Sequence, residues 1–284
     1  MHMKTAPRRL SVSIVLYQTP LEQLKNCLSS LQHITPSLSL FLIDNSPNDC
    51  LRTASDLYPG STYIHQPNNP GYGAGHNTAI KHAQMSEYDY HLVINADVSF
   101  GNDVIYPMIK YMDENQHVAH MMPKVLSMDG SVQRLCKLLP RPFDLFIRRF
   151  LPQSIKVKNN RLFELHESGY DRIMFVPYLS GCFMLLRHSA LRHVGLFDER
   201  FFMYPEDIDL TRRLAVHYET LFYPHVSVYH EHGAASYKSS RMLWIHLVNL
   251  VRYFNKWGWL KDPVRDDLNT KTLNLLNRPV VTRQ

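Results

Sequence analysis

The chain has 284 residues, of which 45% are hydrophobic and 20% are charged, a balance typical of a globular protein with a buried core. No apolar run approaches the length of a membrane-spanning helix. The four cysteines lack the paired spacing of a zinc site, which predicts reduced thiols in the cytoplasm. The formal net charge of +6 predicts an anionic partner, and by itself leaves nucleotide, lipid, membrane surface and nucleic acid open.

The first half of the chain alternates strand-like runs with helical patterns. Strands are predicted at 12–17, 38–44, 61–65 and 91–95, and helices at 21–31 and from about residue 78. Strands that alternate with helices predict a mostly parallel sheet, with functional groups at the carboxyl ends of its strands. Asp44 and Asp97 occupy two of these ends, which is the arrangement of a nucleotide site.

The second half of the chain is less regular. Short strands are predicted within 174–180 and at 220–223 and 226–229, and helices at 188–194 and 239–257. No repeat, low-complexity region or flexible linker divides the chain, so we expect a single domain.

A glycine-rich segment, PGYGAGHN at 70–77, follows the third predicted strand. Its spacing is GxGxG rather than GxGxxG, and it does not follow the first strand, so the dinucleotide-binding fingerprint fails. The three glycines permit positive φ and a close backbone approach before a helix. Either phosphate or ribose lies at this helix N-terminus, or the segment is only a tight loop.

The segment 195–213, GLFDERFFMYPEDIDLTRR, contains five carboxylates, and four of them are candidates beside an aromatic cluster. These four candidates are Asp198, Glu206, Asp207 and Asp209. Pro205 suits the first turn of a helix, where acidic residues are favoured by the helix dipole, so a well-capped helix is the alternative interpretation. At helical spacing Asp209 pairs with Arg212 or Arg213 and is structural, as is Asp198. Asp207 points elsewhere and is the best candidate for proton transfer, with Glu206 in support.

Two histidines end the last predicted strand, in HVSVYHEHG. Because side chains alternate along a strand, His230 and His232 lie on the same face, and either can complete a Mg²⁺ or Mn²⁺ site. Asp97 alone is typical of a capping residue. It is also sufficient as a protein ligand when a diphosphate supplies most of the oxygens around the cation.

In chain order these segments resemble glycosyltransferase family 2, and most closely its rhamnosyltransferase-like branch. The matching segments are SVSIVLYQTP, LFLIDNSPND, NNPGYGAGHNTAI, LVINADV, YLSGCFMLLRHSALRHVGLFDERFFMYPEDIDLTRRL and VYHEHGAAS. Each motif alone is weak, but the ordered series covers residues 11 to about 236 and is specific. The resemblance implies an α/β fold of GT-A type, with a Rossmann-like mixed sheet flanked by helices and an acceptor-binding C-terminal half.

The resemblance also implies how a single domain over residues 1–284 is organised. Its parts are a nucleotide-sugar-binding half at 1–125, an acceptor and catalytic half at 126–238, and a C-terminal helical segment at 239–284. The implied reaction is inverting transfer of a sugar from a nucleotide diphosphate to a glycan or polyprenyl-linked saccharide, in the synthesis of cell-surface polysaccharide such as lipopolysaccharide. We expect the protein in the cytoplasm, at the inner face of the membrane, without a nucleic-acid partner.

The resemblance assigns roles to particular residues. It makes Asp207 the general base with Glu206 beside it, and it makes Asp97 and His230 the ligands of Mg²⁺ or Mn²⁺. It places the donor nucleotide against Tyr17, Thr19, Asp44, Asn69, Gly71, Asn77 and Asn95. The chemistry agrees, because inversion needs one carboxylate to deprotonate the acceptor hydroxyl and a cation to stabilise the departing diphosphate.

Two departures and two alternatives bear on this prediction. The metal motif begins with Asn95, and Ala96 replaces the proline common in the rhamnosyltransferase-like branch, which leaves the donor sugar open. A nucleotidyltransferase would need a basic glycine-rich signature near the first strand, and SVSIVLYQTP lacks it. A non-catalytic nucleotide-binding or anion-binding module would tolerate replacement of Asp97 and Asp207.

A basic segment at 134–161 carries eight Lys or Arg residues and one acid, interleaved with Phe and Leu. This composition predicts peripheral contact with an anionic leaflet or a lipid diphosphate. The alternative is a surface hairpin with an ordinary apolar underside.

Overall fold

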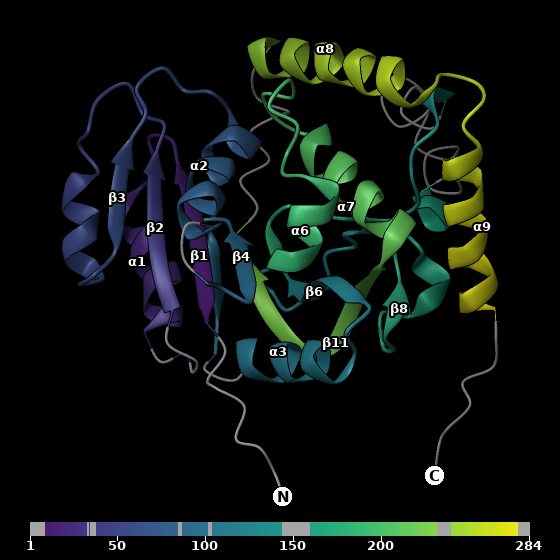
Figure 1. Ribbon diagram of the computed structural model, residues 1–284, viewed down its shortest axis with the longest axis horizontal. Coiled ribbons are helices and arrows are strands. Elements are labelled where there is room, and N and C mark those ends of the chain that lie inside the picture. The colour runs from purple at the N-terminus through teal and green to yellow at the C-terminus, as the bar shows by residue number, and fades with distance from the viewer. Residues whose placement is uncertain are drawn as a thin grey trace, which may run out of the picture.

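The computed structural model describes residues 9–32, 34, 38–84, 87–101, 104–143, 160–231 and 240–277. Within these ranges nine strands form one sheet in the order β3-β2-β1-β4-β10-β6-β11-β5, with β8 paired to β11 (Figure 1). This sheet runs through both predicted halves of the chain. The proposed boundaries at 125 and 238 remain predictions.

The first four strands are parallel and lie where the sequence predicts them. They are β1 (Leu10–Leu16), β2 (Leu38–Asp44), β3 (Thr62–His65) and β4 (Tyr90–Ile94). Strand β1 pairs with β2 on one side and with β4 on the other. Because the connections diverge to either side of β1, the loops after β1, β2 and β4 meet at a topological switch point, where α/β sheets bind ligands.

The alternation of side chains in β1 explains how helices cover both faces of the sheet. Its apolar residues join the core that contains α1 (Leu21–Leu31) and α3 (Ile105–Glu114). Its two serines point to the opposite face, where Ser13 bonds to the ring of His76 in α2 (Tyr72–Gln84) at 2.7 Å. That face is also covered by α6 (His188–Val194) and α7 (Pro205–His217), which share a second core with α2.

Several strands that follow β4 were not predicted by the sequence pattern. They are β5 (Val98–Phe100), β6 (Val118–Leu126), β7 (Cys136–Lys137) and β10 (Phe183–Arg187). Within the predicted range 174–180 lie β8 (Met174–Phe175) and β9 (Tyr178–Leu179). Strand β10 is antiparallel to both β4 and β6, which makes the sheet mixed, as the resemblance implies.

One strand, β11 (Glu219–His230), replaces the two short strands predicted at 220–223 and 226–229. An irregularity between Tyr223 and Ser227 shifts its register against β6. A bulge of this kind bends a strand without ending it. The alternation of the sequence is therefore interrupted at a point where the strand continues.

Two helices complete the C-terminal part of the described chain. Helix α8 (Ser240–Trp257) was predicted, and α9 (Pro263–Leu276) was not. Figure 1 shows α8 crossing the outside of the molecule beyond α7, and α9 descending beside β8. No helix in the described ranges is both long and apolar enough to cross a bilayer.

Helix α2 begins at Tyr72, earlier than the predicted start near residue 78, so the GxGxG segment is its first turn and not a loop. The reason is packing. A Cβ atom on Gly73 would lie 2.9 Å from Cβ of Phe197, and one on Gly75 would lie 2.8 Å from Cγ2 of Val15. The glycines therefore let α2 pack closely against β1 and the loop before α7.

Two sequence predictions involve residues outside the described ranges. These residues are 144–159 of the proposed membrane segment and His232, the alternative metal ligand.

Candidate active site

Asp207 lies in the first turn of α7, and its carboxylate closes against the turn between β9 and β10. Its Oδ2 accepts a hydrogen bond from the backbone N–H of Gly181 at 2.9 Å, and its Oδ1 accepts one from Ile208 at 2.8 Å. A Cβ atom on Gly181 would lie 3.2 Å from Cβ of Asp207. Glycine at this position therefore allows the backbone to approach the carboxylate, and the sequence alone did not reveal it.

Glu206 and Asp207 form a buried pair of adjacent carboxyls that divide their roles. Burial raises the pKa of Asp207 to about 6, while the N–H groups of Gly181 and Ile208 and the charge of Lys137 oppose the rise. Burial and the charge of Asp207 raise the pKa of Glu206 well above its usual range. Within the described chain Oε2 of Glu206 is buried without a hydrogen-bond partner. Burial therefore disfavours a negative charge on Glu206, and Asp207, which two N–H groups stabilise, is the carboxylate positioned to accept a proton.

Asp97 and His230 come together although they lie in different halves of the chain. Asp97 occupies the turn between β4 and β5, and His230 ends β11, which pairs with β5. Nε2 of His230 lies 3.3 Å from Oδ1 of Asp97, and the Asp97 side chain is 20% exposed. The predicted pairing of these two residues is thus present, with a carboxylate that solvent can reach.

Gln133 fixes the orientation of the His230 ring. Its Nε2 donates to the backbone carbonyl of His230 at 2.8 Å, so its Oε1 is the atom that lies 2.9 Å from Nδ1 of that ring. An acceptor at this position makes Nδ1 the donor to Gln133, and Nε2 is the ring nitrogen that faces Asp97. A histidine that donates through its other nitrogen is the usual arrangement around a protein-bound metal. No group of three or more His, Cys, Asp or Glu side chains that could hold a metal lies in the described ranges, so these two residues fit a divalent cation only if other molecules supply its remaining ligands.

Tyr72 joins the metal motif to the turn that holds Asp207. Its hydroxyl donates to Oδ1 of Asn95 at 2.7 Å, and the carbonyl oxygen of Gly181 lies 2.8 Å away. Burial raises the pKa of this hydroxyl, and the nearby charges of Glu206, Asp207 and Asp97 raise it further. Tyr72 is therefore a neutral donor at physiological pH.

Cys182 connects the turn that holds Asp207 with the end of β4, which leads to Asp97. Burial raises the pKa of the Cys182 thiol to about 12, with further contributions from the charges of Asp97 and Asp207. Its backbone carbonyl accepts the N–H of Asn95 at 3.0 Å, which ties β10 to the end of β4. Candidate metal ligand and candidate base thus line one edge of the sheet.

Asp44 lies at the end of β2, as predicted, and it is fully buried. Its oxygens accept hydrogen bonds from the backbone of Ser46 and the hydroxyl of Tyr63. Ser46 in turn accepts the N–H of Gln18 at 2.7 Å, which joins the loops after β1 and β2. The exposed Tyr17 is carried on this joined pair of loops.

Thr19 lies in the loop after β1, where its hydroxyl accepts the N–H of Tyr17 at 3.2 Å. Asn69 precedes α2 with a φ of 43°, a left-handed conformation that asparagine tolerates. Both lie in loops near the carboxyl ends of β1 and β3. Their contact with a nucleotide remains a prediction.

Gly71 and Asn77 have structural partners within the chain. A Cβ atom on Gly71, whose φ is +103°, would clash with the carbonyl oxygen of Phe202. Asn77 is 1% exposed, and its amide binds the backbone of Phe197 in both directions, at 2.8 and 3.0 Å. These contacts hold the start of α2 against the loop before α7. Gly71 and Asn77 therefore support the site through packing.

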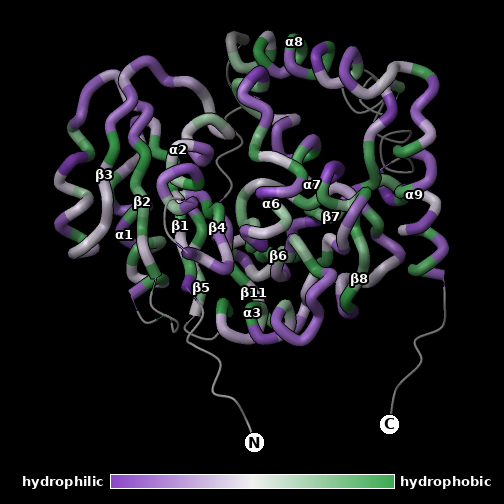
Figure 2. The backbone as a smooth tube through the Cα atoms, viewed as in Figure 1, coloured by the Kyte–Doolittle hydropathy of each residue, from purple (hydrophilic) through white to green (hydrophobic). Residues whose placement is uncertain are grey.

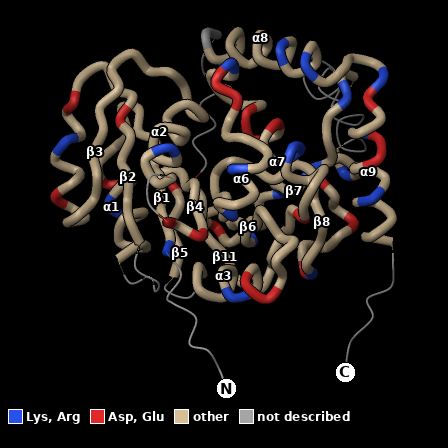
Figure 3. Tube along the Cα trace, in the orientation of Figure 1, with Lys and Arg blue, Asp and Glu red and all other residues tan. Residues whose placement is uncertain are grey.

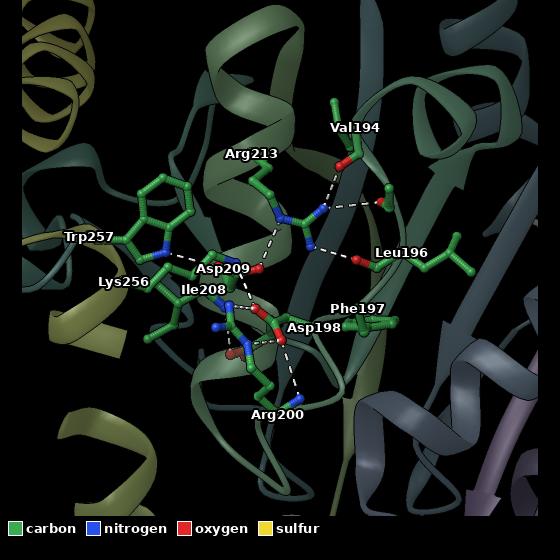
Figure 4. A network of polar contacts seen from close by, with 12 residues as sticks. Val194, Leu196, Phe197, Asp198, Arg200, Ile208, Asp209, Arg213, Lys256 and Trp257 are labelled. Atoms are coloured by element: carbon green, nitrogen blue, oxygen red, sulfur yellow. Dashed lines mark hydrogen bonds and ion pairs between the residues drawn. The ribbon is translucent and has the colours of Figure 1, made fainter. Parts of the chain in front are cut away.

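Asp209 faces away from Asp207 and anchors the C-terminal helices. Figure 4 shows its carboxylate between Arg213, at 2.9 Å, and the end of α8, where Lys256 and the indole N–H of Trp257 donate to it. The contact with Arg213 confirms one of the two helical partners predicted for Asp209. Arg212, the other candidate, instead makes a buried two-point ion pair with Asp262 ahead of α9.

Asp198 is structural, as predicted. Its carboxylate accepts from Arg200 and from Lys256, and these contacts lower its pKa (Figure 4). The pattern from 195 to 213 thus divides into groups that fasten α7 in place and a single carboxylate that faces the site.

Three residues of the site were missed in the sequence, namely Tyr72, Gln133 and Gly181. Tyr72 lies within the glycine-rich motif, and Gly181 lies within one of the segments that match the family. Gln133 lies between β6 and β7 and carried no local signal at all.

A sheet with a topological switch point, candidate metal ligands at its edge and a facing carboxylate defines an enzyme of the GT-A class. The model of the family described as glycosyl transferase family 2 matches residues 11–195. The chain belongs to glycosyltransferase family 2. The matched region ends before α7, so Asp207 and His230 lie beyond it.

Curated relatives agree with this membership. The chain is 28% identical to an N-acetylglucosaminyl-diphospho-decaprenol L-rhamnosyltransferase of Mycobacterium tuberculosis, over 90% of this chain and 88% of that protein. It is 30% identical to the rhamnosyltransferase WbbL of Escherichia coli, over 82% of this chain and 88% of that protein. These similarities favour glycosyl transfer over nucleotidyl transfer or simple anion binding.

The fold also agrees with solved structures. A structure of GalNAc-T7 with UDP, GalNAc and Mn²⁺ aligns with a TM-score of 0.59 and 14% identity over 80% of this chain. The present chain spans 43% of that protein's length. At this identity the similarity establishes the GT-A fold alone.

Proposed function

We propose that this glycosyltransferase is inverting and moves a sugar from a nucleotide diphosphate to a hydroxyl of a lipid-linked saccharide, in the synthesis of a cell-surface polysaccharide. The observation that carries the proposal is the carboxylate of Asp207, positioned by the N–H of Gly181 at 2.9 Å. Rhamnose is the first donor sugar to test, because both curated relatives above are rhamnosyltransferases. The decaprenyl diphosphate in the name of one relative supports a lipid-linked acceptor.

In this proposal Asp207 removes the proton from the acceptor hydroxyl as that oxygen attacks the anomeric carbon. A pKa of about 6 keeps Asp207 ionised at neutral pH while leaving it basic enough to take the proton. Burial and the charge of Asp207 disfavour a second negative charge on Glu206 in the same buried pocket. Tyr72 holds Asn95 and the Gly181 turn in a fixed relation, so the base keeps its position relative to the donor side.

Asp97 and Nε2 of His230 would hold Mg²⁺ or Mn²⁺. When bound, such a cation stabilises the negative charge that builds on the departing diphosphate. A site of only two protein ligands suits this role because phosphate oxygens supply other positions. The Mn²⁺ and UDP in the GalNAc-T7 structure support a cation of this kind.

The donor nucleotide is proposed to lie across the loops after β1, β2 and β4. Tyr17, 49% exposed, offers an aromatic face there, and Asp44 fixes the loop behind it. Thr19, Asn69 and Asn95 lie in the neighbouring loops and remain proposed contacts. Peripheral membrane contact through 134–161 also remains a proposal.

A nucleotide screen followed by a transfer assay tests this function. Thermal shifts are measured with a panel of nucleotide diphosphates and nucleotide sugars, including rhamnose donors, with and without Mn²⁺. Transfer is then assayed to a polyprenyl-diphosphate saccharide, and the anomeric configuration of the product is compared with that of the donor. An inverted product is expected, whereas retained configuration or no shift with any nucleotide would overturn the proposal.

Two variants and a surface control assign the roles. Asp207→Asn is expected to keep the donor-dependent thermal shift and to lose transfer by about 10²-fold or more, because only proton removal is lost. Asp97→Ala is expected to lose the Mn²⁺-dependent part of the shift. Asp49→Asn changes an exposed carboxylate paired with Arg52 and should alter neither. Full activity in folded Asp207→Asn protein would reject this residue as the base.

A further inference from the structure

Helix α8 presents large apolar side chains to solvent, where a surface helix normally carries polar ones. Trp244 is 69% exposed, Val251 is 46% exposed and Leu247 is 39% exposed. Their spacing of three and four residues places them in one row along the helix. We call this row, Trp244, Leu247 and Val251, the outer stripe of α8. Figure 2 shows hydrophobic residues recurring along α8 at the edge of the molecule.

A second tryptophan extends the outer stripe beyond the end of the helix. Trp259 is 43% exposed, and its indole N–H donates to Oδ1 of Asn255 at 2.8 Å. Asn255 follows Val251 by one helical turn, so Trp259 folds back toward the same side of α8. Leu260, which is 89% exposed, follows directly. Tryptophans with aliphatic neighbours on a helix surface are typical of contact with the interfacial region of a bilayer.

The charge of this part of the chain favours a lipid surface over a second copy of the protein. Residues 240–261 contain four Lys or Arg residues and no Asp or Glu, and one of the four, Lys256, is already paired with Asp198 and Asp209. Figure 3 shows basic positions in blue along α8. In a symmetric dimer this cationic stretch would face itself, which is unfavourable. An anionic leaflet, by contrast, attracts basic residues that flank an apolar stripe.

The inner side of α8 holds the loop that leads to the proposed base. Asn249 donates to the carbonyl of Met203 at 2.9 Å, and Arg252 donates to that of Arg200 at 2.7 Å. The ring of Tyr204 packs edge-on against His246, with ring centroids 4.7 Å apart. Tyr204 has a φ of 94°, a strained conformation that this packing supports immediately before α7. The outer stripe therefore lies on the opposite side of the same helix that fixes the approach to Asp207.

We infer that the outer stripe of α8 docks the protein on an anionic bilayer and thereby brings the Asp207 side of the molecule to a lipid-linked acceptor. This surface is separate from the proposed 134–161 contact. The orientation toward the acceptor rests on the proposed function, whereas the docking itself does not. Docking by an interfacial helix accounts for large exposed apolar groups on a cationic helix that is not both long and apolar enough to cross a membrane.

Vesicle flotation with the full chain tests the docking apart from catalysis. Vesicles of phosphatidylcholine alone, and of equal parts phosphatidylcholine and phosphatidylglycerol, contain neither donor nor acceptor. The wild-type protein is expected to float with the anionic vesicles and much less with the neutral ones. The double variant Trp244→Ser, Leu247→Ser should lower the vesicle partition constant by about tenfold or more, because two membrane-inserted apolar groups are lost.

A matched control and a second measurement make the result decisive. Tyr106→Ser and Met128→Ser change residues of 59% and 65% exposure outside α8 and should leave binding unchanged. Circular dichroism and transfer to a water-soluble acceptor should be the same for the double variant and wild type, which separates failure of docking from failure of the proposed function. Vesicle binding unaffected by the double variant would overturn the inference. So would light scattering that reveals a wild-type dimer made monomeric by the double variant, without vesicle binding by either.

Discussion

The hydroxyl of Tyr72 lies 2.7 Å from Oδ1 of Asn95 and 2.8 Å from the carbonyl oxygen of Gly181. One side chain therefore connects the end of β4, where the metal motif lies, with the turn whose N–H positions Asp207. Because Tyr72 is in the first turn of α2, the glycines around it also serve this connection by allowing α2 to pack closely. The site depends on this bridge between the two halves of the sheet.

Replacement of Tyr72 by Phe is expected to lower kcat by about tenfold or more while leaving the fold intact, since a misplaced base is costly even at small displacements. Asn95 loses the donor of its hydrogen bond, and the carbonyl oxygen of Gly181 loses its contact with the same hydroxyl. Steady-state kinetics with donor and acceptor provide the measurement. Tyr106→Phe, on the exposed face of α3, is the control and should retain wild-type kcat.

The pH profile should report the Asp207 carboxyl. Its pKa is raised to about 6, so the basic form is lost as the pH falls through that value, and kcat/KM should fall with it. Lys137 lowers the pKa of Asp207, so Lys137→Met is expected to move the acid limb to higher pH. Lys81→Met removes a cation paired with Glu199 and should not move it. An unmoved limb in Lys137→Met would argue against Asp207 as the titrating base.

Gln133→Ala is expected to weaken Mn²⁺ binding by about 10–100-fold, because the ring of His230 loses the acceptor that fixes its tautomer. Titration calorimetry with Mn²⁺ in the presence of a nucleotide diphosphate measures this directly. Gln32→Ala, an exposed position at the end of α1, serves as the control. Unchanged affinity in Gln133→Ala would contradict the assignment of His230 as a ligand.

Replacement of Asp209 is expected to lower the free energy of unfolding more than replacement of Asp207. Asp209→Asn leaves Arg213 and Lys256 without their buried carboxylate, which should lower the free energy of unfolding by about 3–5 kcal/mol. Asp207→Asn removes a charge whose burial is unfavourable at neutral pH and should change stability much less. Urea denaturation of both variants gives the comparison. Equal stability of the two would show that the network in Figure 4 does not anchor α8.

Gly71→Ala and Gly130→Ala test the close packing of α2. Both glycines have positive φ, at +103° and +82°, but only Gly71 has backbone where a Cβ would lie. Both variants carry the conformational cost of about 1–3 kcal/mol. Gly71→Ala should be destabilised further, and it should lose activity because the carbonyl of Phe202 must move. Thermal unfolding and transfer assays on the pair would reveal whether the clash is absorbed without effect.

Local patterns predicted much of the first half of the molecule. The apolar runs at β1, β2 and β4 are buried strands, which period and length indicate directly. The pattern did not predict that α2 begins inside the glycine motif, because the helix is stabilised by packing against Phe197 and Val15 rather than by its own sequence. The pattern also predicted two short strands in place of β11, because a bulge resembles a turn when only local residues are compared.

Local sequence patterns were sufficient to identify several of the side chains that can do chemistry in this protein. Asp44 and Asp97 follow buried strands, and Asp207 and Asp209 lie two residues apart on a helix and so face different ways. Except for local contacts such as the helical pair Asp209–Arg213, the partners of these side chains depend on the tertiary structure. Tyr72 meets Gly181 across 109 residues, and Gln133 meets His230 across 97. Contacts over such separations leave no local periodicity, because they arise from the order of the strands in the sheet and not from the neighbours of either residue.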